Sequence, residues 1–227
     1  MGEREDKIRG VAKKWWLRGV SCSEASLTTH NRCAGIEAPL EEQASHLLSG
    51  GMMYQGNACG LLSGAVLSAG LQAARRFDDD ATEALTEFEG CDPTPSCTNC
   101  AVETLKRIAS DDQLARSGPT YVAGLAGGVG LLGRSCAALT VGILVLTFRH
   151  YAARGSHRRD SRFLGSLHEL GLARFRRRPA RLLEEFELEF GGDLCSEIVG
   201  RLFTSPDDHA SSTSGNTRSV RFIARVG

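Results

Sequence analysis

The sequence predicts an all-α protein, a helical bundle built from two tandem cysteine-bearing helical repeats. Three observations predict this fold. Apolar side chains recur at helical spacing along most of the chain, runs of alternating β-branched and polar residues are scarce, and a segment of the first half aligns with one of the second. With 41% hydrophobic and 24% charged among its 227 residues, the chain can bury a sizeable core.

Capping and stop signals set the bounds of the expected helices. The first helix is expected over residues 4–18 and ends at Gly19. Pro39 is suited to the first turn of a later helix, and Ser-Gly-Pro at residues 117–119 ends another. Further helices are expected, in chain order, over residues 22–33, 39–49, 59–76, 100–116, 136–153, 179–190 and 194–203.

Two segments of the chain match each other, residues 50–68 and residues 127–145, at an offset of 77. Upstream, residues 21–27 align with residues 99–105 at an offset of 78. Cysteines, glycines and apolar positions agree together, so we infer a duplication. The identical pairs are Gly50/Gly127, Gly51/Gly128, Gly56/Gly133, Cys59/Cys136, Leu62/Leu139 and Leu67/Leu144, and the upstream alignment pairs Cys22 with Cys100.

The duplication divides the chain into a first helical repeat, residues 1–98, and a second, residues 99–203. The second repeat holds an arginine-rich insertion, residues 149–181, whose shorter counterpart in the first repeat is acidic. Two explanations are open: both stretches are solvated charged loops, or the arginines dock an anionic partner. Residues 204–227 are rich in Ser, Asp and Thr and are predicted to be a disordered tail, in which residues 220–226 could form a short strand. The arginines of the docking explanation are Arg174, Arg176, Arg177 and Arg178.

Charge and cysteine content restrict the class of protein. The chain has 27 basic and 27 acidic residues, so we expect neither nucleic acid nor a membrane as a partner. Eight cysteines in 227 residues are too few for a secreted disulfide scaffold, and residues 1–6 are polar, without the apolar run of a signal peptide. We therefore expect a cytoplasmic protein, in which clustered cysteines are redox-active or metal-binding more often than structural.

Five cysteines are each expected to begin a helix, because each follows a turn or a capping residue. Ser21 and Asn99 are predicted N-caps, and Asp193 is the expected cap before the last of the five. Unpaired N–H groups and the positive end of the helix dipole favour an anion in the first turn, so we expect these thiols to be acidified and reactive toward disulfides or metals. The five are Cys22, Cys59, Cys100, Cys136 and Cys195.

The remaining cysteines are of two kinds. Cys91 and Cys97 lie with Cys100 in the sequence GCDPTPSCTNC, which contains one Cys-x-x-Cys pair. Such a pair is either a dithiol/disulfide switch or half of a metal site. Cys33 has no counterpart in the second repeat, and we expect it to be a small buried hydrophobic residue.

Three glycines, Gly56, Gly60 and Gly64, lie around Cys59. Gly60 and Gly64 are four residues apart on one face of a predicted helix, although each costs roughly 1 kcal/mol relative to alanine. This cost indicates that another group approaches the face closely. Either a cofactor binds there, which makes the three glycines candidate cofactor-binding residues, or another helix packs there.

These residues resemble the C-GCAxxG-C-C family of putative redox-active proteins, which also resemble part of the split-Soret cytochromes. The resemblance rests on SCSEASL at residues 21–27, GNACGLLSG at residues 56–64 and FGGDLCSEIVG at residues 190–200, and it covers most of residues 20–203. Leu61 stands where the family motif has alanine, and the second repeat lacks both helix glycines. The resemblance implies thiol redox activity or a thiolate-bound metal such as an iron–sulfur cluster, with no assigned substrate. The metal ligands that it implies are Cys22, Cys59, Cys97 and Cys100.

We therefore expect a redox-active cysteine protein that transfers electrons to a redox partner protein, by thiol/disulfide exchange or through a thiolate-bound metal. Two alternatives are a structural helical protein with inert buried cysteines and a membrane protein, since residues 122–148 carry a single charge, Arg134. That charge falls in the middle of the stretch, which favours a hairpin in the protein core. The candidate thiols are Cys22, Cys59, Cys91, Cys97, Cys100, Cys136 and Cys195.

Overall fold

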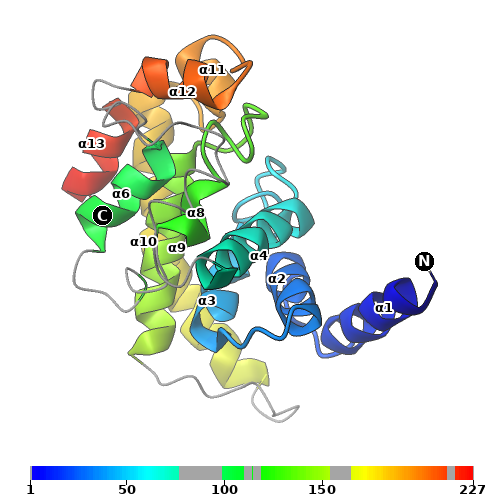
Figure 1. Ribbon diagram of the computed structural model, residues 1–227. Coiled ribbons are helices and arrows are strands. Elements are labelled where there is room, and N and C mark those ends of the chain that lie inside the picture. The colour runs from blue at the N-terminus through cyan, green and yellow to red at the C-terminus, as the bar shows by residue number, and fades with distance from the viewer. Residues whose placement is uncertain are drawn as a thin grey trace.

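The computed structural model describes residues 2–76, 99–109, 114, 119–153, 165–213 and 218–226. This part of the chain is mostly helical and contains one isolated bridge, Ser135 to Leu194, but no strand, which confirms the predicted all-α class (Figure 1). The helices are α1 (Gly2–Trp16), α2 (Cys22–Cys33), α3 (Pro39–Ala44), the 3₁₀ turn η1 (Ser45–Leu48), α4 (Gly60–Arg76), α6 (Cys100–Ile108), α8 (Thr120–Ala123), α9 (Ala137–Ala152), α10 (Gly165–Phe190), α11 (Cys195–Val199), α12 (Pro206–Thr213) and α13 (Arg218–Val226).

Two cysteine-bearing helices begin at the predicted caps. The hydroxyl of Ser21 accepts the backbone N–H of Glu24 at 3.4 Å at the start of α2. The side-chain oxygen of Asn99 accepts the N–H groups of Ala101 and Val102, at 3.0 and 3.1 Å, at the start of α6. Because a cap satisfies N–H groups that have no partner within the helix, these two helices start where their sequences predict.

The helix expected over residues 39–49 is shorter than predicted. The chain leaves α3 at Ala44 and continues as η1. Ser45 donates its hydroxyl hydrogen to the carbonyl of Glu42 at 2.7 Å, and Ser49 donates to the carbonyl of His46 at 2.8 Å. Serine hydroxyls that bond to nearby carbonyls compete with the α-helical pattern, which explains the early end of α3.

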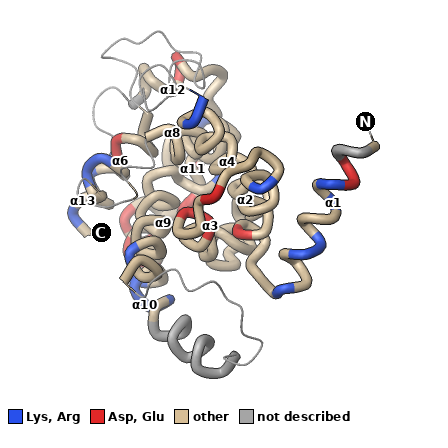
Figure 2. Tube along the Cα trace, turned by 60° about the horizontal axis from the view of Figure 1, so that its bottom comes forward, with Lys and Arg blue, Asp and Glu red and all other residues tan. Residues whose placement is uncertain are grey.

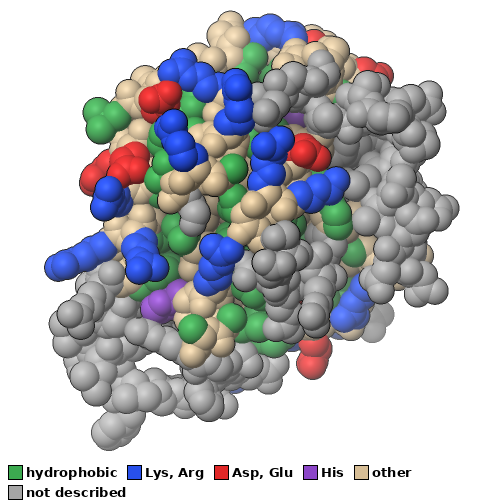
Figure 3. All heavy atoms as spheres, turned by 90° about the vertical axis from the view of Figure 1, so that its left-hand side faces the viewer, with side chains coloured by type: hydrophobic (Ala, Val, Ile, Leu, Met, Phe, Trp, Pro, Cys, Tyr) green, Lys and Arg blue, Asp and Glu red, His purple; other side chains and the backbone are tan. Residues whose placement is uncertain are grey.

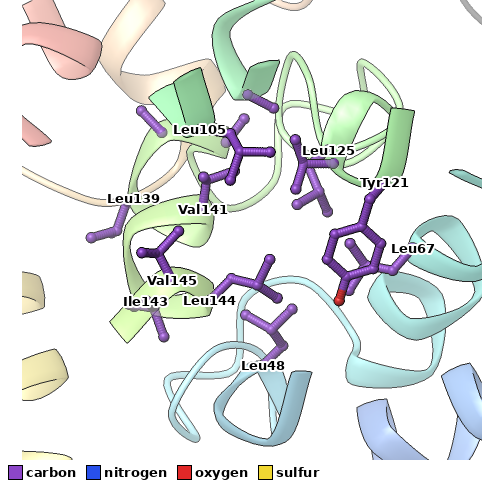
Figure 4. Close-up of a cluster of buried hydrophobic side chains, with 14 of the residues drawn as sticks. Leu48, Leu67, Leu105, Tyr121, Leu125, Leu139, Val141, Ile143, Leu144 and Val145 are labelled. Atoms are coloured by element: carbon purple, nitrogen blue, oxygen red, sulfur yellow. The ribbon is translucent and has the colours of Figure 1, made fainter. Parts of the chain in front are cut away.

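The apolar helix α9 lies at the centre of the molecule, and α3, η1, α6, α10 and α13 pack around it. Figure 4 shows Leu144 of α9 facing Leu48, with Tyr121 of α8 nearby in the same buried cluster. The stretch 122–148 is divided among the end of α8, a turn and most of α9, and most of it is buried in the core, as the sequence favours. The main partners of α8 are α4 and α6, so a hairpin of α8 with α9 stays a prediction. Within the residues described above, no helix has the length and apolar character needed to cross a membrane.

Helices α2 and α4 pack closely against each other, and α1 lies against α2 at the edge of the molecule (Figure 1). Along the Cα tube of Figure 2, the basic residues of α1 and α13 and the acidic residues of α3 lie in separate places. In Figure 3, the basic side chains of one face lie apart from one another, with hydrophobic and neutral atoms between them.

Each of the two matching segments contains a left-handed helical turn. Residues 50–54 all have positive φ, between 55° and 74°, and residues 127–131 all have positive φ, between 60° and 80°. Gly56 and Gly133, again 77 residues apart, have φ of 81° and 66°. Five backbone hydrogen bonds of the first turn each have a counterpart 77 residues later; the N–H of Met53 donates to Leu47 and that of Gly130 donates to Gly124, for example.

Runs of left-handed L-residues are strained and therefore rare, so the agreement of the two turns in φ and in hydrogen bonding is specific. It extends the sequence match of residues 50–68 and 127–145 to three dimensions. The division of the whole chain into two tandem repeats, with boundaries at 98 and 203, stays a prediction.

The arginine-rich insertion differs from the prediction. Helix α10 begins at Gly165 instead of residue 179, so Pro179 lies inside the helix and does not open it. A proline is common in a first turn but does not by itself mark one. Arg177 and Arg178 are exposed, whereas the guanidinium of Arg176 lies 5.7 Å from the centre of the Tyr54 ring. The acidic counterpart of this insertion lies outside the described residues, and docking of an anionic partner stays a prediction.

The prediction of a disordered tail is wrong for residues 206–213 and 218–226, which form α12 and α13, and residues 220–226 are helical and not a strand. The apolar side chains of α13, Val220, Phe222 and Ile223, are buried, and α13 packs against α6 and α9. The ring of Phe222 meets those of Phe186 and Phe190 edge-on. Polar composition predicted disorder, but contacts with distant helices fold this segment.

Candidate thiol centres

The described cysteines at helix starts fall into two groups. Cys22 is the first residue of α2 and Cys59 directly precedes α4; we call these the outer pair. Cys100, Cys136 and Cys195 lie at the starts of α6, α9 and α11; we call these the buried trio. Cys91 and Cys97 lie outside the described residues. Cys33, expected to be buried, is partly exposed at the end of α2.

The outer pair is held by the packing of α2 on α4. Cys22 is partly exposed and Cys59 is exposed. An ideal Cβ built on Gly60 would lie only 2.5 Å from the sulfur of Cys22, so the sulfur occupies space that any other residue at position 60 would fill. The Cys22 thiol therefore lies against the residue that follows Cys59.

The glycines near Cys59 contact α2 and leave no room for a cofactor between the two helices. A Cβ on Gly64 would clash with the backbone of Ser23 and with Ser26. Close packing of α2 on α4 therefore explains why glycine is kept at positions 60 and 64 despite its cost in helix stability. This is the second of the two explanations left open by the sequence. Gly56 has open space around it and a φ of 81°, which is the conformation that favours glycine in a turn.

Replacing Gly60 by alanine is expected to displace the Cys22 sulfur and to change its rate of alkylation by iodoacetamide by several-fold. The neighbours on the other sides are the carbonyl of Leu48 and the N–H of Ser23, both 3.2 Å from the added methyl, so the sulfur is the group that moves. Peptide mapping after timed alkylation measures the rate. Gly10→Ala is the control, because its methyl meets nothing within 4 Å and Gly10 does not have a positive φ. An unchanged rate in Gly60→Ala would contradict the packing described.

The buried trio is assembled by a short antiparallel contact between two segments. Ser135 and Leu194 form a bridge, the N–H of Cys136 donates to the carbonyl of Asp193 at 2.7 Å, and the N–H of Cys195 donates to the carbonyl of Arg134 at 2.8 Å. This contact sets Cys136 and Cys195 side by side. Cys100 is contributed by α6. Burial is the largest cause of the raised pKa of Cys100 and Cys195, and the charge of Cys136 adds to it at both.

The two helices of the tail cover the trio. Nε2 of His209, on α12, lies 3.4 Å from the sulfur of Cys100, and this imidazole is 4% exposed. The hydroxyl of Ser219, on α13, hydrogen-bonds to the sulfur of Cys136. His209 was not predicted as a site residue, because it lies in the segment predicted to be disordered and joins the trio only through tertiary contacts.

Burial controls the acidity of the trio. Cys136 is the N-cap residue of α9, but its side chain makes no capping hydrogen bond. The nearby backbone N–H groups of Leu139 and Ala138 lower its pKa and only partly offset burial. Desolvation nevertheless raises the pKa of Cys136 and Cys195, and it raises the pKa of Cys100 to about 12. The prediction of acidified thiols is therefore wrong for these three: the helix dipole shifts a pKa by less than about one unit, whereas full burial shifts it by several.

Burial also lowers the pKa of His209 to about 4, so its imidazole is neutral at pH 7.

Asp193 does not act as the predicted cap of α11. Leu194 is the capping residue and makes no side-chain bond, while the carboxylate of Asp193 accepts a hydrogen bond from the amide of Asn57. The N–H of Ala58 also donates to the hydroxyl of Ser135 at 3.3 Å. The segments that precede Cys59 and Cys136 are thus in direct contact.

The metal ligands that the resemblance implies do not all lie together in the described structure. Cys22 lies beside Gly60, whereas Cys100 lies with Cys136 and His209; Cys97 is outside the described residues. In the described ranges, no group of three or more Cys, His, Asp or Glu side chains is placed so that it could hold a metal ion.

Comparison with known proteins connects the outer pair to a family. Residues 20–100 match the model of a family described as "Putative redox-active protein (C_GCAxxG_C_C)". The match includes both Cys22 and Cys59 and ends before Cys136 and Cys195. No curated protein and no solved structure matches the chain. The similarity of this chain to the family is confined to residues 20–100, which are less than half of its length.

Proposed function

We propose that the protein is a thiol redox protein in which Cys22 and Cys59 alternate between two thiols and one disulfide. One observation carries the proposal: the sulfur of Cys22 lies against the residue next to Cys59, in space kept free by Gly60. Residues 20–100, which hold both cysteines, match the redox family.

The two thiols differ in exposure, so they take different steps of the exchange reaction. Cys59 is exposed and can reach the disulfide of a partner protein, whereas Cys22 is partly covered by α4. The thiolate of Cys59 attacks one sulfur of the partner's disulfide and releases the other as a thiol. The thiolate of Cys22 then attacks the mixed disulfide at Cys59. This step forms the Cys22–Cys59 bond and releases the second partner thiol. The outer pair loses two electrons and two protons, and the partner gains them.

The buried trio is less suited to this reaction. Disulfide exchange requires a thiolate that can reach its target, and burial both raises the pKa of Cys100, Cys136 and Cys195 and covers them. The outer pair therefore supports exchange with a partner protein better than the trio does.

The test is to map the cysteine pairs formed when the reduced full-length protein is treated with glutathione disulfide. We expect loss of two thiols per chain and a cross-linked peptide pair that joins Cys22 to Cys59. In Cys59→Ser the cross-link is absent, and Cys22 carries at most a glutathione adduct. Cys33→Ser is the matched control, because Cys33 is a partly exposed cysteine at the other end of α2, and it retains the cross-link.

Two results would overturn the proposal. One is that the thiols of the outer pair stay reduced at glutathione ratios that oxidise a free dithiol. The other is that Cys22 or Cys59 pairs with a different cysteine of the chain, such as Cys91 or Cys97.

A further inference from the structure

We propose that a groove between α1 and α2 binds the partner protein whose disulfide Cys59 attacks. The segment that it takes is extended and carries a large apolar side chain next to acidic residues. This inference rests on the redox function proposed for the outer pair and names the kind of partner that the pair meets. The groove has a volume of about 510 Å³, within the range of about 300–1,000 Å³ that is typical of binding pockets.

The groove begins beside the outer pair. Ser26 lines it and lies four residues after Cys22 in α2, so the two residues share a face of the helix and are about 6 Å apart along its axis. Leu61 lines it from α4 and follows Cys59 by two residues, so their Cα atoms are at most about 7.6 Å apart. The hydroxyl of Ser26 donates to the carbonyl of Leu61 at 2.7 Å, which joins the two walls. A segment whose disulfide meets Cys59 therefore reaches the groove within about two or three residues.

The lining of the groove favours an apolar occupant, although three polar residues of α2 belong to it. Thr29 donates its hydroxyl hydrogen to the carbonyl of Ala25 at 2.6 Å, and Nδ1 of His30 donates to the carbonyl of Ser26 at 2.8 Å. The hydroxyl of Ser26 is likewise bonded to a carbonyl, so these donors are satisfied within the protein. A sugar or a nucleotide, which needs free donors, fits this lining poorly. The apolar lining residues are Ile8, Ala12, Trp16, Ala25 and Leu61.

Two of these apolar side chains are largely exposed. Trp16 at the end of α1 is 63% exposed, and Leu61 near the start of α4 is 53% exposed. Exposed apolar surface with a polar rim is typical of a site for another protein, and tryptophan is enriched at such sites. A large apolar side chain of the partner, placed between Trp16 and Leu61, would cover both.

The rim of the groove is basic. Arg9 and Lys13 line it from α1, four residues apart, and both are exposed. Among the described residues that line the groove, none is acidic. Arg9 lies 3.6 Å from Asp6, but their side chains are 78% and 75% exposed, so water screens this pair and a partner's carboxylate can compete for Arg9. The rim therefore favours acidic residues beside the apolar one, and opposite charge also speeds the encounter of the two proteins.

The experiment measures binding to full-length Cys59→Ser, in which the exchange reaction cannot start. The probe is a synthetic peptide that is cyclised by a disulfide and extended by leucine and glutamate residues. One matched peptide has serine in place of leucine, and another has lysine in place of glutamate. Trp16 is one of two tryptophans in the chain, so its fluorescence reports binding. We expect the leucine–glutamate peptide to shift the emission to shorter wavelength and to bind at least about tenfold more tightly than either matched peptide.

Charge reversal and truncation in the groove should change this binding. Lys13→Glu should weaken binding of the leucine–glutamate peptide by about fivefold or more and move the preference toward the lysine peptide. Lys14→Glu is the matched control, because Lys14 is the next residue of α1, is exposed and does not line the groove. Leu61→Ser should weaken binding by about fivefold or more, since it removes an apolar contact. Its control is Leu188→Ser, at a leucine of α10 that is 87% exposed.

A second measurement connects the groove to the reaction of Cys59. In the protein with both thiols of the outer pair, Lys13→Glu should lower the rate with the leucine–glutamate peptide several-fold relative to the rate with 2-hydroxyethyl disulfide, which is small and neutral. Lys14→Glu should leave this ratio unchanged.

Two results would overturn the role of the groove. One is equal binding of the three peptides to Cys59→Ser. The other is a change of tryptophan emission with vesicles of anionic lipid but not with the leucine–glutamate peptide, which would indicate a membrane as the occupant. Glutathione disulfide and 2-hydroxyethyl disulfide do not need the groove. Their reaction with the outer pair therefore tests the redox function separately, and a failure of one test is distinguished from a failure of the other.

Discussion

Replacing Gly128 by alanine is expected to destabilise the protein by about 4 kcal/mol or more, the range of substitutions that damage the backbone itself. Gly128 has a φ of 80°, in the left-handed turn before the buried trio. An added Cβ would lie 2.5 Å from both the N and the O of Arg134 and 2.8 Å from the Cβ of Cys195. Backbone atoms cannot rotate away as a flexible side chain can, so the turn and the 193–195 segment must separate.

Gly130→Ala is the matched control for this substitution. Gly130 lies in the same turn with a φ of 65°, but a Cβ on it meets nothing within 4 Å. Only the left-handed strain is added there, about 1–2 kcal/mol. Urea unfolding followed by circular dichroism measures both free energies of unfolding. Equal effects of the two substitutions would show that the turn is not packed as described.

Replacing Ile223 by alanine is expected to cost about 2–5 kcal/mol, as for other fully buried aliphatic side chains. Ile223 has no exposed surface, and its Cγ2 lies 3.1 Å from the position of a Cβ on Gly142, at the middle of α9. Gly142 leaves room for this side chain, so truncation leaves a cavity that α9 cannot fill by a simple rotamer change.

Arg221→Ala is the control on the same helix, because Arg221 is exposed and a surface substitution changes stability by less than about 0.5 kcal/mol. Thermal and chemical unfolding of both variants provide the comparison. If α13 were detached from the body of the protein, both substitutions would leave the unfolding midpoint unchanged.

Local chemistry made part of this fold predictable from the sequence. The starts of α2 and α6 depend on Ser21 and Asn99, whose capping bonds reach only two or three residues along the chain. The all-α class follows from helical spacing, and the match of residues 50–68 with residues 127–145 indicated that both would fold alike locally. These features depend on interactions between residues that are close together in the sequence, so a short segment is enough to predict them.

The rest depends on contacts between distant segments. The tail looked disordered because its composition is polar, yet Val220, Phe222 and Ile223 find a surface on α6 and α9. The prediction of acidified thiols at helix starts rested on the helix dipole alone. The pKa of Cys100 is instead set mainly by its burial under other elements. His209 could join the trio only once α12 was placed. Neither the burial of the thiols nor the position of α12 can be predicted from the residues next to the cysteines in the sequence.

The left-handed turns limit which amino-acid substitutions this protein can tolerate. Five of their residues are not glycine, namely Met52, Met53, Tyr54, Val129 and Leu131. At about 1 kcal/mol or more each, their strain sums to about the whole net stability of a small domain. Met52 and Val129, which correspond at the offset of 77, offset their strain by filling the core, where they are 2% and 1% exposed. Tyr54 is 65% exposed and gains little from burial, so tolerance to substitution in these turns should depend on what each side chain packs against, more than on the backbone that all five share.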